Sequence, residues 1–262
     1  MIMMPAMNDK LMASWRTLFA VTEQMPSGWT LVGGQMVHLL CAEHHVTPVR
    51  PTDDLDAGID VRAYPSALLD FTTALHRLGF RPDGISADGY QHRWINDDGL
   101  QYDVLIPVGV GPHLKMRQGY SGSPMVSGAG VQRALDRTQV VGVQLVDGTT
   151  GSVRRPDLLG ALVVKAAAYG TADTNRQRHL TDFAILATLL TNPRDLVGMT
   201  RSDETRILSL TRTLADDPRA TAMVNQGQKA VETLGQYVAQ IRRRRELAGN
   251  HGASAFPFGA GR

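Results

Sequence analysis

The chain has 262 residues, of which 43% are hydrophobic and 20% charged, and its formal net charge is +2. This composition is typical of a globular protein with one large or two small domains, and the small net charge gives no general attraction for nucleic acid. The single cysteine, Cys41, excludes a disulfide framework, and no apolar run reaches about 18 residues, so we expect no membrane helix and a cytoplasmic location.

Residues 1–9 are expected to be loose, and residues 10–25 carry an apolar stripe that predicts a helix. Residues 29–32 predict a strand. Gly33-Gly34 then predict a turn into a short apolar helix over residues 35–42 that buries Cys41 as an inert thiol. A glycine turn that opens a helix offers unpaired backbone N–H groups and the positive end of the helix dipole, which suits a phosphate group.

The next segment carries carboxylates at alternate positions, Asp54 and Asp56, after Thr52. Residues two apart in a strand point to the same face, so these two acids are expected to project together. Paired carboxylates repel each other unless a cation lies between them, and their hard oxygen atoms suit Mg²⁺. Asp60 has the same parity, but a solvated carboxylate at the strand end is the favoured interpretation.

Residues 66–78 predict a helix, and residues 80–87 and 90–95 predict two short strands. A hairpin turn follows, and residues 100–108 then predict a core strand with one acid, Asp103. An acid in a core strand is costly unless it is paired or bound to metal. From this segment alone, a metal ligand and a surface carboxylate are about equally plausible, and Asp54 and Asp56 favour the metal ligand.

Residues 110–125 predict an exposed basic loop, and residues 133–145 predict further strands. Pro156 is placed for the first turn of an apolar helix over residues 157–169, which contains Lys165. That lysine either extends from a buried helix to solvent or reaches into a site. In the next predicted helix, residues 179–190, His179 and Asp182 lie three apart on one face.

After residue 192 the chain becomes more polar, and residues 195–215 and 218–246 predict helices. The last of these ends in four consecutive arginines, residues 242–245. A solvated helix end that favours the helix dipole is the preferred interpretation over a contact with nucleic-acid phosphates. The predicted organisation is a core with an N-terminal helix over residues 1–150, a helical region over 151–248 and a disordered tail over 249–262.

These features together suit nucleotidyl transfer. Two metal ions held by two or three carboxylates can activate a hydroxyl and stabilise a leaving pyrophosphate. Asp54, Asp56 and Asp103 would supply the carboxylates, the glycine turn would hold the triphosphate, and Lys165 would neutralise developing charge.

The ordered combination resembles the DNA polymerase β-like nucleotidyltransferase superfamily. The residues that match its first motif are Gly33, Gly34, Thr52, Asp54 and Asp56, and Asp103 matches its third carboxylate position. The segment from residue 161 to 186 is similar to the AbiEii/MenT type of nucleotidyltransferase-like toxin, in which a helix lysine precedes a helix aspartate. Lys165 and Asp182 match those positions, with His179 one turn earlier.

The resemblance implies an α+β fold, with a mixed β-sheet nucleotidyltransferase core, flanking helices and a C-terminal helical region. It implies an NTP substrate, one or two Mg²⁺ ions, and catalytic roles for Asp54, Asp56, Lys165 and Asp182. It also implies nucleotide binding by residues that include Gln35, Thr52 and His179. The acceptor it implies is the tRNA 3′ end, in a toxin–antitoxin or abortive-infection system with a cognate antitoxin protein.

Two other functions remain open on the sequence. The first keeps the chemistry and changes the acceptor to a protein or small-molecule hydroxyl, which the near-neutral net charge favours slightly. The second is a catalytically silent nucleotide-binding regulator. Clustered acids are costly to retain without catalysis, which argues against the silent protein.

Overall fold

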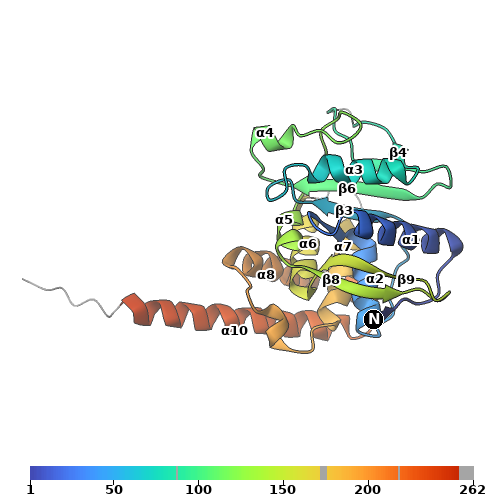
Figure 1. The fold of residues 1–262 in the computed structure, drawn as a ribbon. Coiled ribbons are helices and arrows are strands. Elements are labelled where there is room, and N and C mark those ends of the chain that lie inside the picture. Colours follow the sequence, from blue (N-terminus) through green and yellow to red (C-terminus); the bar gives the residue numbers. More distant parts are fainter. Residues whose placement is uncertain (87, 172–175, 218, 254–262) are drawn as a thin grey trace, which may run out of the picture.

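The computed structural model describes residues 1–86, 88–171, 176–217 and 219–253 (Figure 1). It has the predicted α+β fold, with a mixed sheet, flanking helices and a C-terminal helical region around one apolar core. The strands are β1 (Ile2–Met3), β2 (Trp29–Val32), β3 (Leu55–Ile59), β4 (Arg81–Pro82), β5 (Arg93–Ile95), β6 (Gln101–Pro107), β7 (Ser127–Gly128), β8 (Thr138–Gln144) and β9 (Thr150–Pro156). The helices are α1 (Asp9–Gln24), α2 (Gly33–Glu43), α3 (Ala67–Arg77), α4 (Pro112–Lys115), α5 (Val131–Asp136), α6 (Leu158–Thr171), α7 (Arg176–Thr188), the 3₁₀ helix η1 (Pro193–Leu196), α8 (Arg201–Asp216), α9 (Arg219–Ala222) and α10 (Gly227–Ala253).

The larger sheet has the strand order β2-β3-β6-β5-β4, and β7 pairs with β6. Strands β3 and β6 are parallel, whereas β2 and β5 run antiparallel to their neighbours, so the sheet is mixed. The register of the parallel pair places Asp56 opposite Asp103. Residues directly opposite each other on adjacent strands are side-chain neighbours. Two acids 47 positions apart therefore meet at the centre of the sheet.

The predictions for residues 10–42 agree with the structure. Asn8 caps α1, because its side-chain oxygen accepts a hydrogen bond from the Leu11 amide at 2.8 Å. Strand β2 has the predicted bounds, and α2 begins directly at the glycine pair. Cys41 is buried as predicted, and burial raises the pKa of its thiol to about 12.

A second sheet, with the order β1-β8-β9, overturns the expectation that residues 1–9 are loose. Strand β1 pairs in parallel with β8, and the Met4 amide continues the ladder by donating to the Gln144 carbonyl at 2.9 Å. Met4 is buried in the core, which gives this short strand an apolar anchor. The sheet lies beside β2, where the Arg154 guanidinium donates to the Trp29 carbonyl at 2.9 Å.

The prediction of continuous strands over residues 133–145 is half wrong, because the chain first forms helix α5 and then β8. Gly130 enters α5 with φ of 78° and lies so close to α6 that a Cβ there would be 2.8 Å from the Cα of Val164. Val131 and Ala134 of α5 are buried, and α5 packs against α6 and against the larger sheet. Tertiary packing, rather than the local alternation, decides this segment.

The predicted helix start at Pro156 is also wrong, because β9 continues through that residue and α6 begins at Leu158. Asp157 acts as the cap, since its carboxylate accepts a hydrogen bond from the Gly160 amide at 2.9 Å. A boundary at residue 150 would separate β9 from its partner β8, with which it shares seven paired positions. The change from strands to helices therefore occurs at residue 158.

The C-terminal region is helical as predicted, but its elements are divided differently. The predicted helix over residues 195–215 is η1 followed by α8, and each begins with a capping box, at Asn192 and at Thr200. Helix α10 extends to Ala253, past the predicted tail start at residue 249, and residues 254–262 lie outside the described ranges. In Figure 1 its C-terminal end extends away from the rest of the molecule. None of the helices within these ranges is long and apolar enough to cross a membrane.

Candidate active site

The site begins where strand β2 turns into helix α2. Gly33 has φ of 69°, a conformation that glycine adopts readily, and a Cβ at this position would overlap the Asp56 carboxylate. A Cβ at Gly34 would be 2.6 Å from the hydroxyl oxygen of Thr52. The first N–H groups of a helix have no partner within the helix. The glycine pair therefore lets β3 pass directly against these unpaired donors.

Two side chains of α2 hold the segment that leads into β3. The Gln35 amide donates to the Thr52 carbonyl at 2.5 Å, and His38 Nε2 lies 2.8 Å from the Arg50 carbonyl oxygen. Both contacts are with backbone oxygen atoms, so they fix the course of the chain around Thr52. The structure places Gln35 behind this segment, fully buried, and not at the surface that a nucleotide would touch.

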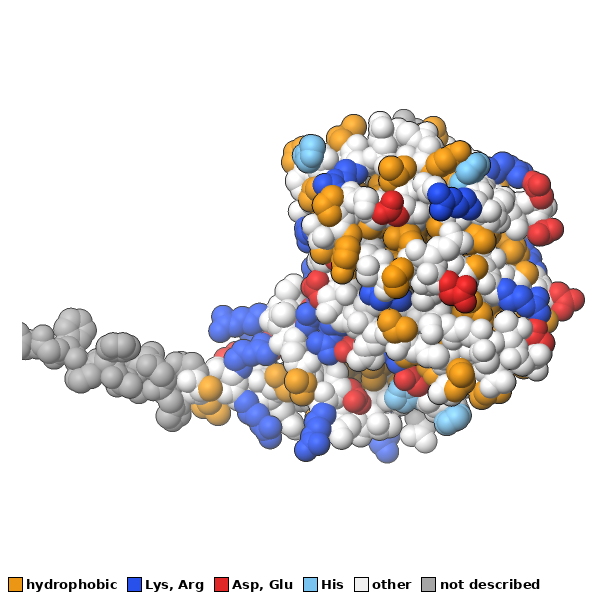
Figure 2. Space-filling model, viewed as in Figure 1, with side chains coloured by type: hydrophobic (Ala, Val, Ile, Leu, Met, Phe, Trp, Pro, Cys, Tyr) orange, Lys and Arg blue, Asp and Glu red, His pale blue; other side chains and the backbone are white. Residues whose placement is uncertain are grey.

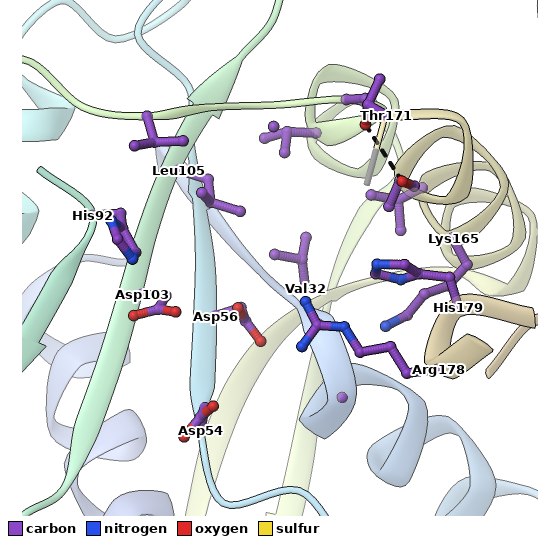
Figure 3. A pocket seen from close by; sticks show the side chains of 18 of the residues that line it. Val32, Asp54, Asp56, His92, Asp103, Leu105, Lys165, Thr171, Arg178 and His179 are labelled. Atoms are coloured by element: carbon purple, nitrogen blue, oxygen red, sulfur yellow. Dashed lines mark hydrogen bonds between the residues drawn. The ribbon is translucent and has the colours of Figure 1, made fainter. Parts of the chain in front are cut away.

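Three carboxylates line one wall of the cavity, those of Asp54, Asp56 and Asp103 (Figure 3). Asp54 comes directly before β3, Asp56 lies in β3, and Asp103 lies opposite Asp56 in β6. Burial, followed by the charge of Asp103, raises the pKa of Asp56 to about 6. The same two causes raise the pKa of Asp54. This wall therefore carries negative charge that the protein compensates incompletely.

Asp103 has a cationic partner that the sequence analysis did not anticipate. The Arg93 guanidinium donates from Nε to Oδ1 at 3.1 Å and from Nη2 to Oδ2 at 3.2 Å. The two residues are also register partners in strands β5 and β6. Alternation along β5 and the hairpin between β5 and β6 are sequence signals for this contact, but they do not by themselves fix which residues of the two strands lie opposite each other. Asp103 is thus partly neutralised, whereas Asp54 and Asp56 make no ion pair within the described residues.

The opposite wall is built on a buried ionic cluster of Lys165, Asp182 and Arg50. The Lys165 ammonium donates to Asp182 Oδ2 at 2.7 Å, and the Arg50 guanidinium donates to both oxygen atoms of Asp182 at 2.7 Å. Asp182 is 2% exposed. Burial alone would raise the pKa of Asp182, but Lys165 and Arg50 outweigh burial and hold the pKa below its usual range. The cluster links the segment before β3 to helices α6 and α7.

Helix α7 contributes His179 and Arg178 to the same wall, and Figure 3 shows Arg178 reaching across the cavity towards Asp56. Burial, reinforced by Lys165, lowers the pKa of His179 to about 4, so its imidazole is neutral at pH 7. Its Nδ1 atom is buried without a hydrogen-bond partner in the described structure. Arg178 is exposed, and the patterns that predict the other site residues do not single it out.

The cavity between the two walls has a volume of about 480 Å³. Eight of the predicted site residues line it: Gly33, Gly34, Thr52, Asp54, Asp56, Asp103, Lys165 and His179. Gln35 and Asp182 lie behind its surface and act on it through Thr52 and Lys165. The lining also includes six polar side chains absent from the predicted set: Arg50, His92, Arg93, Ser127, Thr171 and Arg178.

The donor set fits a divalent cation that arrives with a phosphate ligand. Within the described ranges, no three His, Cys, Asp or Glu side chains are grouped so that they would hold one metal ion. Mg²⁺ is commonly bound by one or two carboxylates together with substrate phosphates. Asp54, directly before β3, and Asp56, in β3, supply two carboxylates whose pKa values are raised first by burial and then by the charge of Asp103, so a bound cation would stabilise their ionised forms.

No family model matches this chain, and no curated protein matches its sequence. Among solved structures, the chain is similar to the antibiotic-resistance factor ANT(2'')-Ia, which is known from a solution structure. The two chains are 12% identical, the match covers 94% of this chain and 99% of the other, and the TM-score is 0.38. So distant a likeness carries no argument about activity, and function has to be argued from the cavity itself.

Proposed function

We propose that this chain is a metal-dependent nucleotidyltransferase that moves a nucleotide from an NTP to a hydroxyl group of an acceptor. One observation carries the proposal: three carboxylates on adjacent strands face a wall of cations across a cavity that opens at the start of a helix. An NTP needs complementary groups of this kind. Cations and helix N–H groups match its phosphates, and paired carboxylates match the Mg²⁺ that accompanies them.

In this reaction the acceptor hydroxyl oxygen attacks the α-phosphorus of the NTP. The bond between the α-phosphorus and the bridging oxygen breaks, pyrophosphate leaves, and the hydroxyl proton passes to a carboxylate or to solvent. Asp54 and Asp56 would hold Mg²⁺, which stabilises charge on the reacting phosphate when bound. Lys165 and Arg178 lie on the opposite wall, where they would neutralise the leaving pyrophosphate.

Asp182 has a different role from the one that the family resemblance implied. Its two carboxylate oxygen atoms are occupied by Lys165 and Arg50, and it is buried behind the cavity. We therefore assign it as a positioning residue that presents these two cations to the nucleotide. This assignment is consistent with its lowered pKa, because a carboxylate that stays ionised keeps both cations in place.

For the acceptor we propose the 3′ end of tRNA, and for the biological role a toxin that is controlled by an antitoxin protein. The support is the sequence resemblance through Lys165 and Asp182 and the exposed arginines beside the cavity, such as Arg178. The competing acceptor is a small-molecule or protein hydroxyl, and the net charge of +2 favours it.

The test is incubation with each α-³²P-labelled NTP, Mg²⁺ and total tRNA. Label on tRNA that disappears with EDTA, with Asp54→Ala and with Lys165→Ala is the expected result. If the label appears on protein or on a small molecule instead, the acceptor assignment is wrong and the proposed nucleotidyl transfer stands. Unchanged labelling in both variants would remove the catalytic assignment. Growth arrest on expression of the wild type, absent with Asp54→Ala, would support the toxin role.

A further inference from the structure

The second half of α10 forms a strongly basic surface with the start of α8. We call it the basic arm, and it consists of Arg201 and Arg242–Arg245. Figure 2 shows Lys and Arg side chains gathered where the helical region extends from the body of the molecule. The acids interspersed with these five arginines are Asp203, Glu204 and Glu246, so the arm by itself carries as much positive charge as the whole chain, +2.

Part of the arm is fixed against α8. Arg245 pairs with Glu204 and donates to the Met199 carbonyl at 2.7 Å, and Arg242 pairs with Glu246 at 3.0 Å. Together with Arg201 these side chains line a hollow of about 240 Å³ between the two helices. The arm is therefore held at a defined position for at least as far as Arg245.

The other part of the arm, Arg243 and Arg244, has side chains that are not paired within the described structure. Arg243 and Arg244 are exposed and make no hydrogen bond or ion pair with any residue that the structure describes. Consecutive residues of a helix are rotated by about 100°, so the four arginines surround the helix instead of forming one stripe. Two of them are thus available to a partner on the side that faces away from α8.

The helix dipole does not account for these arginines. Cations are favoured by the dipole in the last turn of a helix, but α10 continues eight residues past Arg245, to Ala253. Four adjacent like charges repel each other in the interior of a helix. A polyanion bound at this surface would relieve the repulsion among the arginines, because arginine binds phosphate groups through two parallel hydrogen bonds.

The arm also lies far from the cavity. Met223 lines a groove that continues from the cavity through Arg50, Asp54 and Arg178, and α10 begins four residues later at Gly227. At 1.5 Å per residue, Arg243 is about 24 Å further along the helix axis. An acceptor that reacts at the cavity and also contacts the arm must therefore be an extended polyanion.

We propose that the basic arm binds the sugar-phosphate backbone of an RNA acceptor, at a distance from the hydroxyl that reacts. The proposal rests on the nucleotidyltransferase function for its biological sense, but the arm's binding is measurable without transfer. An RNA satisfies both requirements of charge and length. An acidic protein would meet the charge requirement without the length requirement, and competition between polyglutamate and unlabelled RNA for the arm distinguishes the two partners.

The experiment compares Arg243→Glu/Arg244→Glu with a control of equal charge change, Arg77→Glu/Arg81→Glu, which alters exposed arginines of α3 and β4. Fluorescence anisotropy measures binding of a fluorescein-labelled tRNA transcript at several salt concentrations. Each phosphate contact contributes roughly 0.7–0.9 to the slope of log K against log salt. The arm variant is expected to bind about tenfold more weakly at 0.1 M salt and to lower the slope by about 1.5, whereas the control keeps the wild-type slope.

Equal slopes for wild type and arm variant would overturn the proposal, as would displacement of the tRNA by polyglutamate as effective as displacement by unlabelled RNA. Transfer assays separate this outcome from failure of the proposed function. An RNA trinucleotide is too short to reach the arm, so the arm variant should raise KM for tRNA and not for the trinucleotide. If the wild type labels neither acceptor, the proposed transfer fails, and the salt slope still decides whether the arm binds RNA.

Discussion

Asp56 is the residue at which stability and proposed activity oppose each other most directly. Its carboxylate is half-buried against Gly33 and beside Asp103, and its pKa is raised to about 6. At pH 8 the folded protein therefore holds an unfavourable negative charge that the unfolded chain hydrates freely. Active sites commonly retain destabilising groups of this kind.

Replacing Asp56 by Asn should lower nucleotidyl transfer by at least about 100-fold. The same change should raise the free energy of unfolding at pH 8 by about 1–2 kcal/mol, because it removes a charge that burial and then Asp103 disfavour. Urea denaturation and initial rates measure the two effects. Asp60→Asn is the matched control, since Asp60 caps the following turn through the Arg62 and Ala63 amides and lies outside the cavity lining. A less stable Asp56→Asn variant would contradict the electrostatic account.

Replacing Asp182 by Ala should destabilise the protein by about 3–5 kcal/mol, because it leaves the buried Lys165 ammonium without its counter-ion. Urea denaturation measures the loss. Asp217→Ala removes a carboxylate from an exposed pair with Arg219 and should leave the midpoint unchanged. Asp182→Asn keeps the size of the side chain, so a positioning role predicts a raised KM for NTP in that variant. A wild-type KM with Asn would contradict the positioning role.

His179 should make stability depend on pH. Its folded pKa is about 4, whereas an unfolded histidine titrates near 6.5, so between these values the unfolded chain binds the extra proton. The free energy of unfolding should therefore fall by up to about 3 kcal/mol as the pH drops from 7 to 4.5. Burial is the largest cause of the low pKa of His179; the charges of Lys165, Arg178 and Arg50 add to it, and the charge of Asp182 opposes it. His179→Gln should show a smaller fall by urea denaturation, and an equal fall would refute this assignment.

At the scale of elements, the junction between β2 and α2 requires glycine at position 33 for two reasons: the backbone conformation and the lack of room for a Cβ atom. Gly33 and Gly79 both have positive φ values, 69° and 84°. A Cβ at Gly33 would overlap Asp56, whereas a Cβ at Gly79 would meet nothing within 4 Å. Comparing alanine variants at the two positions therefore separates two contributions to the free energy of unfolding: the strain of a positive φ angle and the steric clash with Asp56.

Gly79→Ala should cost about 1 kcal/mol, which is the backbone cost alone. Gly33→Ala should cost about 1–3 kcal/mol more, since the Asp56 carboxylate must move, and it should abolish transfer. Thermal denaturation and labelled-NTP assays measure both. If both variants lose the same free energy of unfolding, the contact between Asp56 and α2 leaves room for a Cβ atom and the steric argument is wrong.

At the scale of the whole molecule, the described residues share one apolar core that extends from Met4 in the first strand region to Val238 in α10. The core is thus continuous across residue 150, where the sequence predicts a boundary, and we propose that the two parts unfold as one unit. The ion cluster of Arg50, Lys165 and Asp182 joins the same two parts through charges.

Urea unfolding should therefore be one cooperative transition. The three tryptophans, Trp15, Trp29 and Trp94, are fully buried in the part of the molecule that contains the sheets, so their fluorescence reports on that part. Far-UV circular dichroism is dominated by the helices, including α8 and α10. Coincident midpoints are expected, and a helical transition at distinctly lower urea would show two independently stable units.

Much of the site was accessible from local patterns. The glycine pair, the alternate acids Asp54 and Asp56, and the lone acid Asp103 lie in elements with clear apolar periodicity. Those patterns place Asp56 and Asp103 on the correct strands, whereas Asp54 lies directly before its strand and the glycine pair is the first turn of α2. The strand predicted over residues 133–136 and the helix start predicted at Pro156 are wrong because α5 packs on α6 and β9 pairs with β8, and a local window contains neither partner.

The sequence by itself determined which residue types were available and on which elements: clustered acids on strands, a glycine turn before a helix, and a lysine and an aspartate on successive helices. Only the tertiary structure decided which of them meet. Strand register brought Asp103 to Asp56 and Arg93 to Asp103, and packing of α6 and α7 on the segment before β3 gave Asp182 to Lys165 and Arg50. Periodicity sets the face on which a side chain lies, whereas its partner depends on long-range pairing that no local pattern encodes.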